Sequence, residues 1–242
     1  MAAVTHAVTT PDTGNTPNAS GAFTPAVGDL LIVFVGVEAS LNDPGVLTGT
    51  GAGLTFTQVR RQLYQSSAAS FYVFVANALV SAASSQTVQI ESGGDAGAGS
   101  NISVLRVSGM VRVGLAAIRQ SAGQSNTAAG TPAPSFGAAA LTANACLGAI
   151  ANATNPAGLV QPASWSESSD TGYTTGQVNG IETAFRNSGE TGTTITWGGA
   201  SASAFASLVV ELDTSIPPFN PTRRARLHRT SGVPALGASY GA

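Results

Sequence analysis

The longest unbroken apolar run is the feature that most constrains what this chain can fold into. Residues 28–38 read GDLLIVFVGVE, in which a polar Gly-Asp pair precedes a run of β-branched, aromatic and other apolar residues. Such a run is too short for a typical helix and favours a strand. It therefore predicts a strand that is buried on both faces. It is also far shorter than the ~20 apolar residues that a membrane-spanning helix needs.

A weaker copy of this run lies at residues 141–153 and reads LTANACLGAIANA. The segments that follow each run come in the same order: an aromatic-led strand, a second strand, an alternating strand, a loop of small residues and an apolar strand. In the first half these strands are expected at 54–59, 70–79, 87–91 and 101–107, and in the second half at 163–170, 180–187, 193–197 and 205–212. The sequence therefore predicts an internal pseudo-duplication.

No segment shows apolar residues at helical spacing over three turns, so we expect an all-β protein. Many short strands favour an antiparallel, jelly-roll-like β-sandwich. A single half would leave one face of its sheet exposed, so the two halves, about 21–130 and 131–214, are expected to form one sandwich over 21–214.

Other segments are predicted to be less regular. Residues 1–20 form an N-terminal segment with a short strand near 4–8. Residues 41–53 are rich in turn residues and are expected to be a long loop. Residues 111–115 could form a short edge strand, and residues 120–131 are expected to be a polar loop.

Charged residues make up only 9% of the chain, and every basic residue is Arg. A weakly charged surface of small residues suits a protein that is packed in an assembly, although codon usage explains it equally well. The start of the chain has no charged segment followed by an apolar one, so we expect no secretory signal. No membrane association is expected.

The composition changes after Asp213. Residues 215–242 begin with a Pro-rich stretch that cannot continue a strand ladder and then become an extended Arg-rich arm. The arm carries a charge of +4 and the rest of the chain −6. Docking onto an acidic neighbour is favoured over a solvated tail, and nucleic acid is the least favoured partner. The predicted docking residues are Arg223, Arg224, Arg226, Arg229, Leu227, Leu236 and Tyr240.

Other chemically suggestive residues have plainer interpretations. Gly49, Gly51 and Gly53 precede a predicted strand instead of a helix, so they are interpreted as a turn and not as a phosphate-binding loop. Cys146, the one cysteine, has His6 and His228 as its only candidate partners, both near the chain ends, and is interpreted as a small buried apolar residue.

The carboxylates and tryptophans leave further alternatives open. Glu38 and Asp43 lie near one strand end, and Glu167 and Asp170 are expected at the equivalent place in the second half. A glycosidase pair or a calcium loop would need such oxygens at a fixed spacing, which the sequence does not demand. Trp165 and Trp197 could stack on a sugar, but strand tryptophans are more often part of the core.

The ordered segments GDLLIVFVGVE, LTFTQV, SFYVFVANAL, TVQIE and NISVLRVSG, followed by ALTANACLGAIANA, ASWSES, TTITW and FASLVVELD, resemble a β-sandwich module of tailed-bacteriophage virion proteins. This resemblance covers residues 20–214. It implies a non-enzymatic structural protein of capsid-decoration, head-fibre or tail-surface type, made in the host cytoplasm and placed on the particle surface. It brings no catalytic residues, no cofactor and no metal.

Capsid decoration, or a minor head role, is favoured over a tail or neck role because one compact unit with a docking arm suits a repeated surface lattice. The implied partners are the major capsid protein or neighbouring structural subunits. A homo-oligomer is expected, with a trimer as the candidate assembly. Two alternatives have distinct requirements: a carbohydrate- or receptor-binding module predicts an exposed Trp165 or Trp197, and a glycan hydrolase predicts two converging carboxylates.

Overall fold

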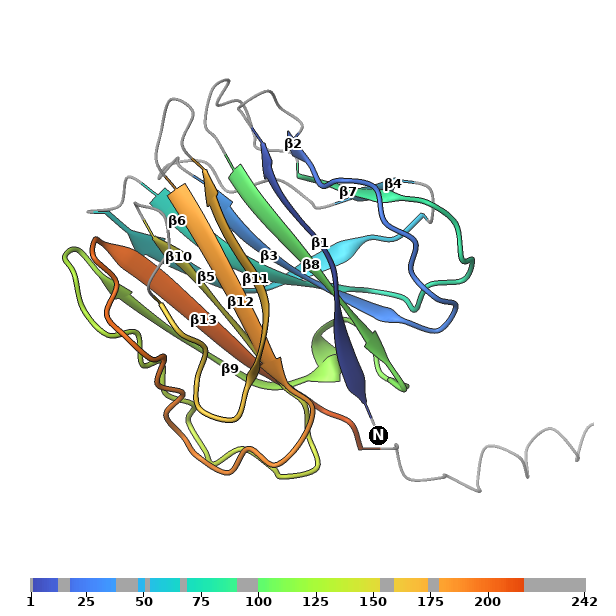
Figure 1. Cartoon of the computed structure of the whole chain (residues 1–242). Coiled ribbons are helices and arrows are strands. Elements are labelled where there is room, and N and C mark those ends of the chain that lie inside the picture. The colour runs from blue at the N-terminus through green and yellow to red at the C-terminus, as the bar shows by residue number, and fades with distance from the viewer. Residues whose placement is uncertain are drawn as a thin grey trace, which may run out of the picture.

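The chain folds into two five-stranded antiparallel sheets that pack against each other (Figure 1). The computed structural model describes residues 2–12, 18–37, 48–50, 53–65, 69–90, 100–152, 159–173 and 179–215. Within these ranges every named element is a strand except one short 3₁₀ helix, η1 (Gly114–Ala117). The predicted all-β sandwich is therefore confirmed.

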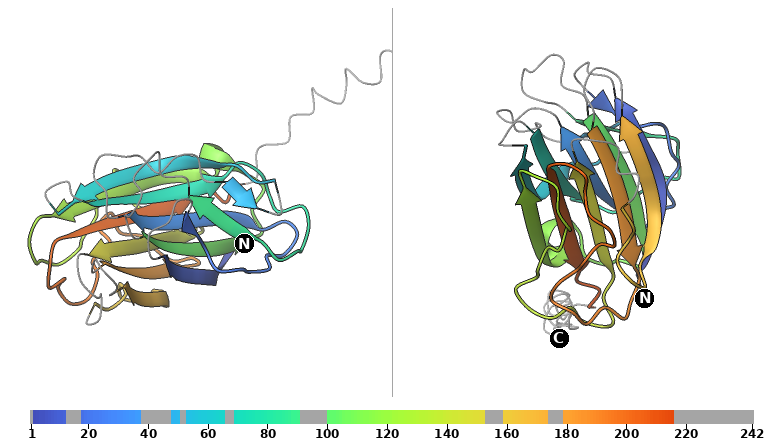
Figure 2. Two further views of the ribbon diagram at one scale, coloured as in Figure 1. Left: turned by 90° about the horizontal axis from the view of Figure 1, so that it is seen from above. Right: turned by 60° about the vertical axis from the view of Figure 1, so that its left-hand side comes forward.

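Each sheet has its own set of strands, and Figure 2 shows the two layers from two further directions. The first sheet has the order β1–β8–β3–β6–β5 and the second has the order β11–β12–β10–β13–β9. The first sheet consists of β1 (Ala3–Asp12), β3 (Leu30–Val37), β5 (Phe56–Tyr64), β6 (Ala69–Ala76) and β8 (Ser100–Ser108). The second sheet consists of β9 (Ile118–Asn126), β10 (Cys146–Asn152), β11 (Ser166–Tyr173), β12 (Asn179–Arg186) and β13 (Phe205–Leu212).

The two sheets share one topology, which supports the predicted internal repeat. Strands β3, β5, β6, β8 and β1 take the places that β10, β11, β12, β13 and β9 take in the second sheet. Even the irregularities agree, because β5 shifts register between Gln58 and Arg60 and β11 shifts register between Glu167 and Ser169. Aligning these two β-bulges assigns each strand residue of one half to a counterpart in the other.

A further layer covers the outer face of each sheet. In the first half it is a three-stranded sheet of β2 (Asn18–Ala19), β4 (Thr48–Thr50) and β7 (Thr87–Ile90). In the second half a ladder of backbone hydrogen bonds joins residues 130–136 to residues 193–201, and Val160 pairs with Gly198. Residues 193–197 thus take the place of β7, but the strand predicted there is reduced to isolated bridges.

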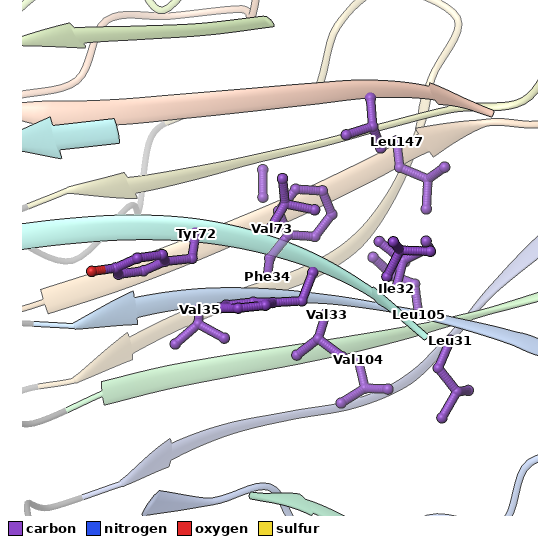
Figure 3. Packing of buried hydrophobic residues seen from close by; sticks show 14 of the residues in the cluster. Leu31, Ile32, Val33, Phe34, Val35, Tyr72, Val73, Val104, Leu105 and Leu147 are labelled. Atoms are coloured by element: carbon purple, nitrogen blue, oxygen red, sulfur yellow. The ribbon is translucent and has the colours of Figure 1, made fainter. Parts of the chain in front are cut away.

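The strand β3 is fully buried because both of its faces are covered. Ile32 and Phe34 point toward Leu147 of the second sheet, whereas Val33 and Val35 point the opposite way (Figure 3). These outward side chains lie in the same buried cluster as Val88 of the covering layer. The predicted two-sided burial of the apolar run is confirmed.

A smaller core lies between the outer face of the second sheet and its covering segments. It joins sheet residues with residues from the covering loops, and all of its members are buried: Ala122, Phe136, Ala140, Cys146, Ile150, Leu159, Trp165, Ala184, Ile195, Trp197, Phe205 and Val209. We call this cluster the second core.

The two sheets are also joined along one lateral edge, between β5 and β9. Arg60 Nη1 donates to the Ser121 carbonyl at 3.3 Å, and Gln62 Nε2 donates to Ser125 Oγ at 2.9 Å. A Cβ at Gly123 would come within 2.9 Å of Arg60 Nε, Gln62 Oε1 and Leu208 Cδ2, so a larger residue there would have to displace these side chains. Both strands are at the ends of their sheets, and this contact protects the edges from pairing with other chains.

Three predictions for the less regular segments were wrong. The expected polar loop at 120–131 contains most of β9, which pairs with β13 in the second sheet. The expected long loop at 41–53 contains the strand β4. The expected edge strand at 111–115 is absent from the described structure there, and the helix η1 begins at Gly114.

Candidate functional site

The arm residues predicted to dock onto a partner, Arg223, Arg224, Arg226, Leu227, Arg229, Leu236 and Tyr240, lie outside the described residues. The described structure reaches Ser215, which Arg112 binds through its Nε to the carbonyl and through Nη2 to the hydroxyl, both at 3.1 Å. Arg112 also pairs with Asp213 at 3.4 Å. The point at which the chain leaves the second sheet is thus anchored, while docking stays a prediction.

Both tryptophans belong to the second core, as the core interpretation predicts. Trp165 is 5% exposed and Trp197 is 1% exposed. The two indoles lie over Gly148 of β10, where an added Cβ would come within 3.4 Å of each. Neither ring offers the exposed face that the carbohydrate-binding alternative requires.

Cys146 is also part of this core. Burial, followed by the negative charges of Glu211 and Glu190, raises the pKa of the Cys146 thiol to about 12. A thiol in this state is a poor nucleophile at neutral pH. His6 lies on β1 in the other sheet, where its Nε2 contacts Thr9 Oγ1 at 2.8 Å, and His228 lies outside the described residues.

The glycine-rich stretch before β5 is also structural where it is described. Gly49 is in the strand β4 and pairs with Val88 of β7. Gly53 has a φ of 61°, a conformation that glycine adopts without strain, and it precedes a strand. The turn interpretation was therefore wrong for Gly49, while Gly53 leads into a strand and not into the helix N-terminus on which a phosphate loop depends. Gly51 lies outside the described residues.

Most charged side chains of the described body are paired. Four salt bridges join Arg106 to Asp29, Arg112 to Asp213, Arg119 to Glu211 and Arg186 to Glu190. Of the acidic side chains that the structure describes, Glu167, Asp170 and Glu182 have no such partner. All three lie in the neighbouring strands β11 and β12.

A small pocket of about 230 Å³ lies beside the paired residues Arg186 and Glu190. It is lined by Pro162, Ala163, Trp165, Arg186, Glu190, Thr194, Ile195 and Thr196. Glu190 accepts from Trp165 Nε1 at 3.0 Å and from Arg186 Nη1 at 3.2 Å. Burial raises the pKa of Glu190, but hydrogen bonds from the Gly192 amide, Trp165 and the Thr191 amide outweigh it and lower the pKa overall.

These contacts use up the hydrogen-bonding capacity of Glu190. Its Oε1 accepts from the Thr191 and Gly192 amides at 3.0 and 2.9 Å, and its Oε2 accepts from Trp165 and Arg186. An ionised carboxylate held in this way fixes the turn at 190–192 against the second core. We therefore interpret Glu190 as a structural residue of the pocket wall.

Glu182 is the most unusual polar residue of the described structure. It lies in β12, is 1% exposed, and neither of its carboxyl oxygens has a hydrogen-bond partner. Burial, followed by the negative charges of Asp170 and Glu167, raises its pKa to about 8. Asp170 lies directly opposite Glu182 across the β11–β12 ladder.

Two other buried oxygens on the same face of the second sheet also lack partners: Asn152 Oδ1 and Ser207 Oγ. Asn152 is 1% exposed and Ser207 is fully buried. Glu182 and Ser207 flank Ile150 from the two neighbouring strands, and Asn152 lies two residues further along β10. Side chains two residues apart on a strand share a face, so these groups lie on one side of the sheet.

Sequence reasoning singled out Glu167 and Asp170 but missed Glu182, Asn152 and Ser207. The structure places Glu167 and Asp170 in β11, whose counterpart in the first half is β5, so the predicted equivalence with Glu38 and Asp43 was wrong for these two. Glu38 and Asp43 themselves lie outside the described residues. One sequence feature could have identified Glu182: it is a lone acidic residue within a strand that is otherwise expected to be buried.

Two further features are absent from the residues that the structure describes. No group of three or more His, Cys, Asp or Glu side chains converges on a metal position there. No helix in those ranges is long and apolar enough to cross a membrane.

Comparison of the chain with protein-family models, with curated proteins and with solved structures found no match.

Proposed function

We propose that this chain is a non-enzymatic structural subunit of a bacteriophage virion, in the first instance a capsid decoration or minor head protein. In this proposal the sandwich lies on the particle surface, and residues 215–242 dock onto a neighbouring subunit. The alternative within the same class is a tail or neck surface protein.

The observation that carries the docking role is the distribution of charge. Four of the six Arg outside the arm form salt bridges within the body, so the body satisfies most of its own positive charge. The remaining four Arg lie between residues 223 and 229, in a segment that has no acidic residue at all. Their counter-charges must come from outside this segment, and in this proposal an acidic surface on a neighbour supplies them.

The architecture of the body supports a structural role. The central strands of both sheets are buried on both faces, and β5 and β9 protect each other at one lateral edge. Such a body is a rigid unit that does not rely on strand pairing with other chains. Association through an appended segment is then the simpler route to assembly.

The test compares three forms of the full chain. One is unchanged, one lacks residues 217–242, and one carries Arg223→Gln, Arg224→Gln, Arg226→Gln and Arg229→Gln. We expect all three to show the same cooperative unfolding of the sandwich and only the unchanged chain to be incorporated into particles. Normal incorporation of the truncated chain would refute the docking role.

Mass spectrometry of separated heads and tails then distinguishes decoration from a tail or neck position. Light scattering coupled to size-exclusion chromatography measures the oligomer, for which we propose a trimer. If the four-Gln variant is incorporated as well as the unchanged chain while the truncated chain is not, apolar residues of the arm carry the docking and the charge argument is wrong.

A further inference from the structure

Glu182 carries a buried carboxyl group for which the described residues provide no partner. It is 1% exposed, and neither Oε1 nor Oε2 has a hydrogen bond. Its side chain shares a face of β12 with Ala184, which is part of the second core. An ionised carboxylate is costly in such surroundings without donors or a positive charge, so the group holds a proton instead.

The first half shows that the fold does not need this group. With the two β-bulges aligned, Tyr72 of β6 takes the place of Glu182. By the same alignment, Ile102 of β8 takes the place of Ser207. Tyr72 and Ile102 are both fully buried, and Arg61 lies over the Tyr72 ring with its guanidinium carbon 5.3 Å from the ring centroid. The second half thus replaces an apolar corner with an acid.

The charged groups of the described structure that face Glu182 are both negative. Asp170 lies directly opposite it on β11, and Glu167 lies on the same strand. Burial, followed by these two charges, raises the pKa of Glu182 to about 8. The segments that cover this face carry no charged side chain: residues 130–136, 159–165 and 193–201.

The other titratable groups on this face of the sheet lie in a different row. Arg186, Cys146 and Glu211 pair with one another across β12, β10 and β13. They are four residues along their strands from the row of Glu182, which is about 13 Å. Arg186 is also paired with Glu190. The proton on Glu182 is therefore what keeps this part of the sheet free of opposed charges.

Strand β11 is the element that can yield when Glu182 ionises. It lies at the end of its sheet, and its ladder with β12 shifts register between Glu167 and Ser169. None of its described residues belongs to either apolar core. Instead, Ser168 Oγ donates to the Thr183 carbonyl at 3.0 Å and lies 2.6 Å from the Thr183 hydroxyl. Elements with few buried apolar contacts open locally before the whole domain unfolds.

We propose that β11 is a pH-sensitive latch, which is closed while Glu182 carries its proton and is released when that carboxyl ionises. Ionisation sets Glu182 against Asp170 across the ladder, and directly opposed like charges are unfavourable there. Separation of β11 from β12 brings the Glu182 carboxylate into water. It also leaves the edge of β12 open to pairing with another strand.

The direction of the pH dependence follows from which state of the protein holds the proton. In the unfolded chain a glutamate loses its proton at about pH 4.3, whereas Glu182 in the folded protein keeps it up to a pKa of about 8. Between these values the folded state binds one more proton, so the folding equilibrium constant falls about tenfold for each unit of rising pH. Above the folded pKa this contribution to stability is lost completely.

The experiment compares the full chain with Glu182→Gln, which keeps the shape of the side chain but cannot ionise. Urea unfolding at several values between pH 5 and pH 9 gives the folding equilibrium constant of each protein. The ratio of the unchanged protein's constant to that of the variant should fall about tenfold per unit up to pH 8 and then level off. The control Asp213→Asn should show no such change in its ratio. A total change of less than tenfold for Glu182→Gln would overturn the proposal, because a purely structural role gives an offset that does not depend on pH.

Hydrogen exchange of the unchanged protein tests whether β11 is the element that opens. After correction for the intrinsic exchange rate, the amides of β11 should be less protected than those of the central strand β3, and their protection should fall at least tenfold from pH 6 to pH 8. In Glu182→Gln the β11 amides should be equally protected at both values. If β11 is as well protected as β3, it opens only when the whole sandwich unfolds and the latch is overturned. Protection of β11 that is the same at pH 6 and pH 8 in the unchanged protein would overturn it as well.

Discussion

The substitution Glu211→Leu tests whether a buried carboxylate stabilises the fold of this sandwich. Glu211 in β13 is fully buried and binds four groups. Its Oε1 accepts from Asn144 Nδ2 at 2.7 Å and from the Leu141 amide at 2.9 Å. Its Oε2 accepts from Gln120 Nε2 at 2.5 Å and pairs with Arg119. The carboxylate therefore ties β13, β9 and the start of β10 together.

The size of the loss in Glu211→Leu follows from which donors are left unpaired. Asn144 is 4% exposed, so its amide cannot turn to water, and a buried unpaired donor costs about 1–3 kcal/mol. The Leu141 amide adds a similar amount. Arg119 is 28% exposed and also donates to the Ala139 carbonyl, so it recovers much of its hydration. We expect a loss of about 3–5 kcal/mol, as is typical when one partner of a buried pair is removed.

Urea denaturation followed by circular dichroism and tryptophan fluorescence measures this loss. The matched control is Asp213→Asn, which lies two residues further on and removes a partly exposed ion pair with Arg112 worth about 1 kcal/mol or less. If Glu211→Leu destabilises the protein by no more than the control does, the carboxylate does not hold these segments together and the reasoning is refuted.

Three further predictions concern the second core. Folding lowers the pKa of the Glu190 carboxyl, so its ionised form stabilises the protein above the pKa of the unfolded chain, and this stabilisation is lost as the pH falls through the pKa of the folded protein. Glu190→Gln should therefore destabilise the protein at pH 7 but not at pH 3 in denaturant titrations. Gly148→Ala should cost about 1–3 kcal/mol because its Cβ would lie 3.0 Å from Val209, whereas Gly137→Ala, with nothing within 4 Å, should be nearly neutral. Cys146 should not react with a disulfide reagent at pH 8 until the protein is unfolded; prompt reaction of the native protein would contradict its burial.

The elements that were predicted correctly are those whose own residues favour a strand. The run at β3 is apolar at every position, so its two-sided burial follows from composition alone. The repeat could be found because the order of strands, and not any exact motif, recurs in the second half. The alternating segment at β7 and the aromatic segments at β5, β6 and β11 likewise became strands, since their side chains fit a buried or half-buried pleated surface. The alternating segment at 193–197 forms only isolated bridges, so the strand predicted there was wrong.

The strand β9 was missed because its own residues do not favour a strand. Its sequence, IRQSAGQSN, has few apolar residues and contains a glycine, so it resembles a loop. It forms a strand because β13 presents an unpaired ladder beside it and because Gly123 lets it approach the side chains of β5. Both causes are tertiary contacts, so neither can be recognised in the sequence of β9 itself.

The candidate site could not be predicted from the sequence, for a related reason. The acid at Glu182 was visible, but its burial and its unpaired oxygens depend on which strands surround it. Asn152 and Ser207 lie far from it in the chain and join it only through β10 and β13. Sequence reasoning instead favoured the Arg-rich arm, where the charge signal is local.

The duplication provides an internal test of which buried polar groups the fold itself requires. At the base of the first sheet, Arg106 pairs with Asp29, and the alignment of the halves matches these two residues with Glu211 and Asn144, which also bind each other. The charges differ between the halves, but a polar pair persists at the same place, so its role is to join β3 to β8 and β10 to β13. The corner around Glu182 behaves in the opposite way, because its counterpart is an apolar corner that packs without any buried carboxylate. A group that one copy of a scaffold omits is not required by the scaffold, so the buried carboxyl of Glu182, unlike the Glu211 network, is not explained by the needs of the fold.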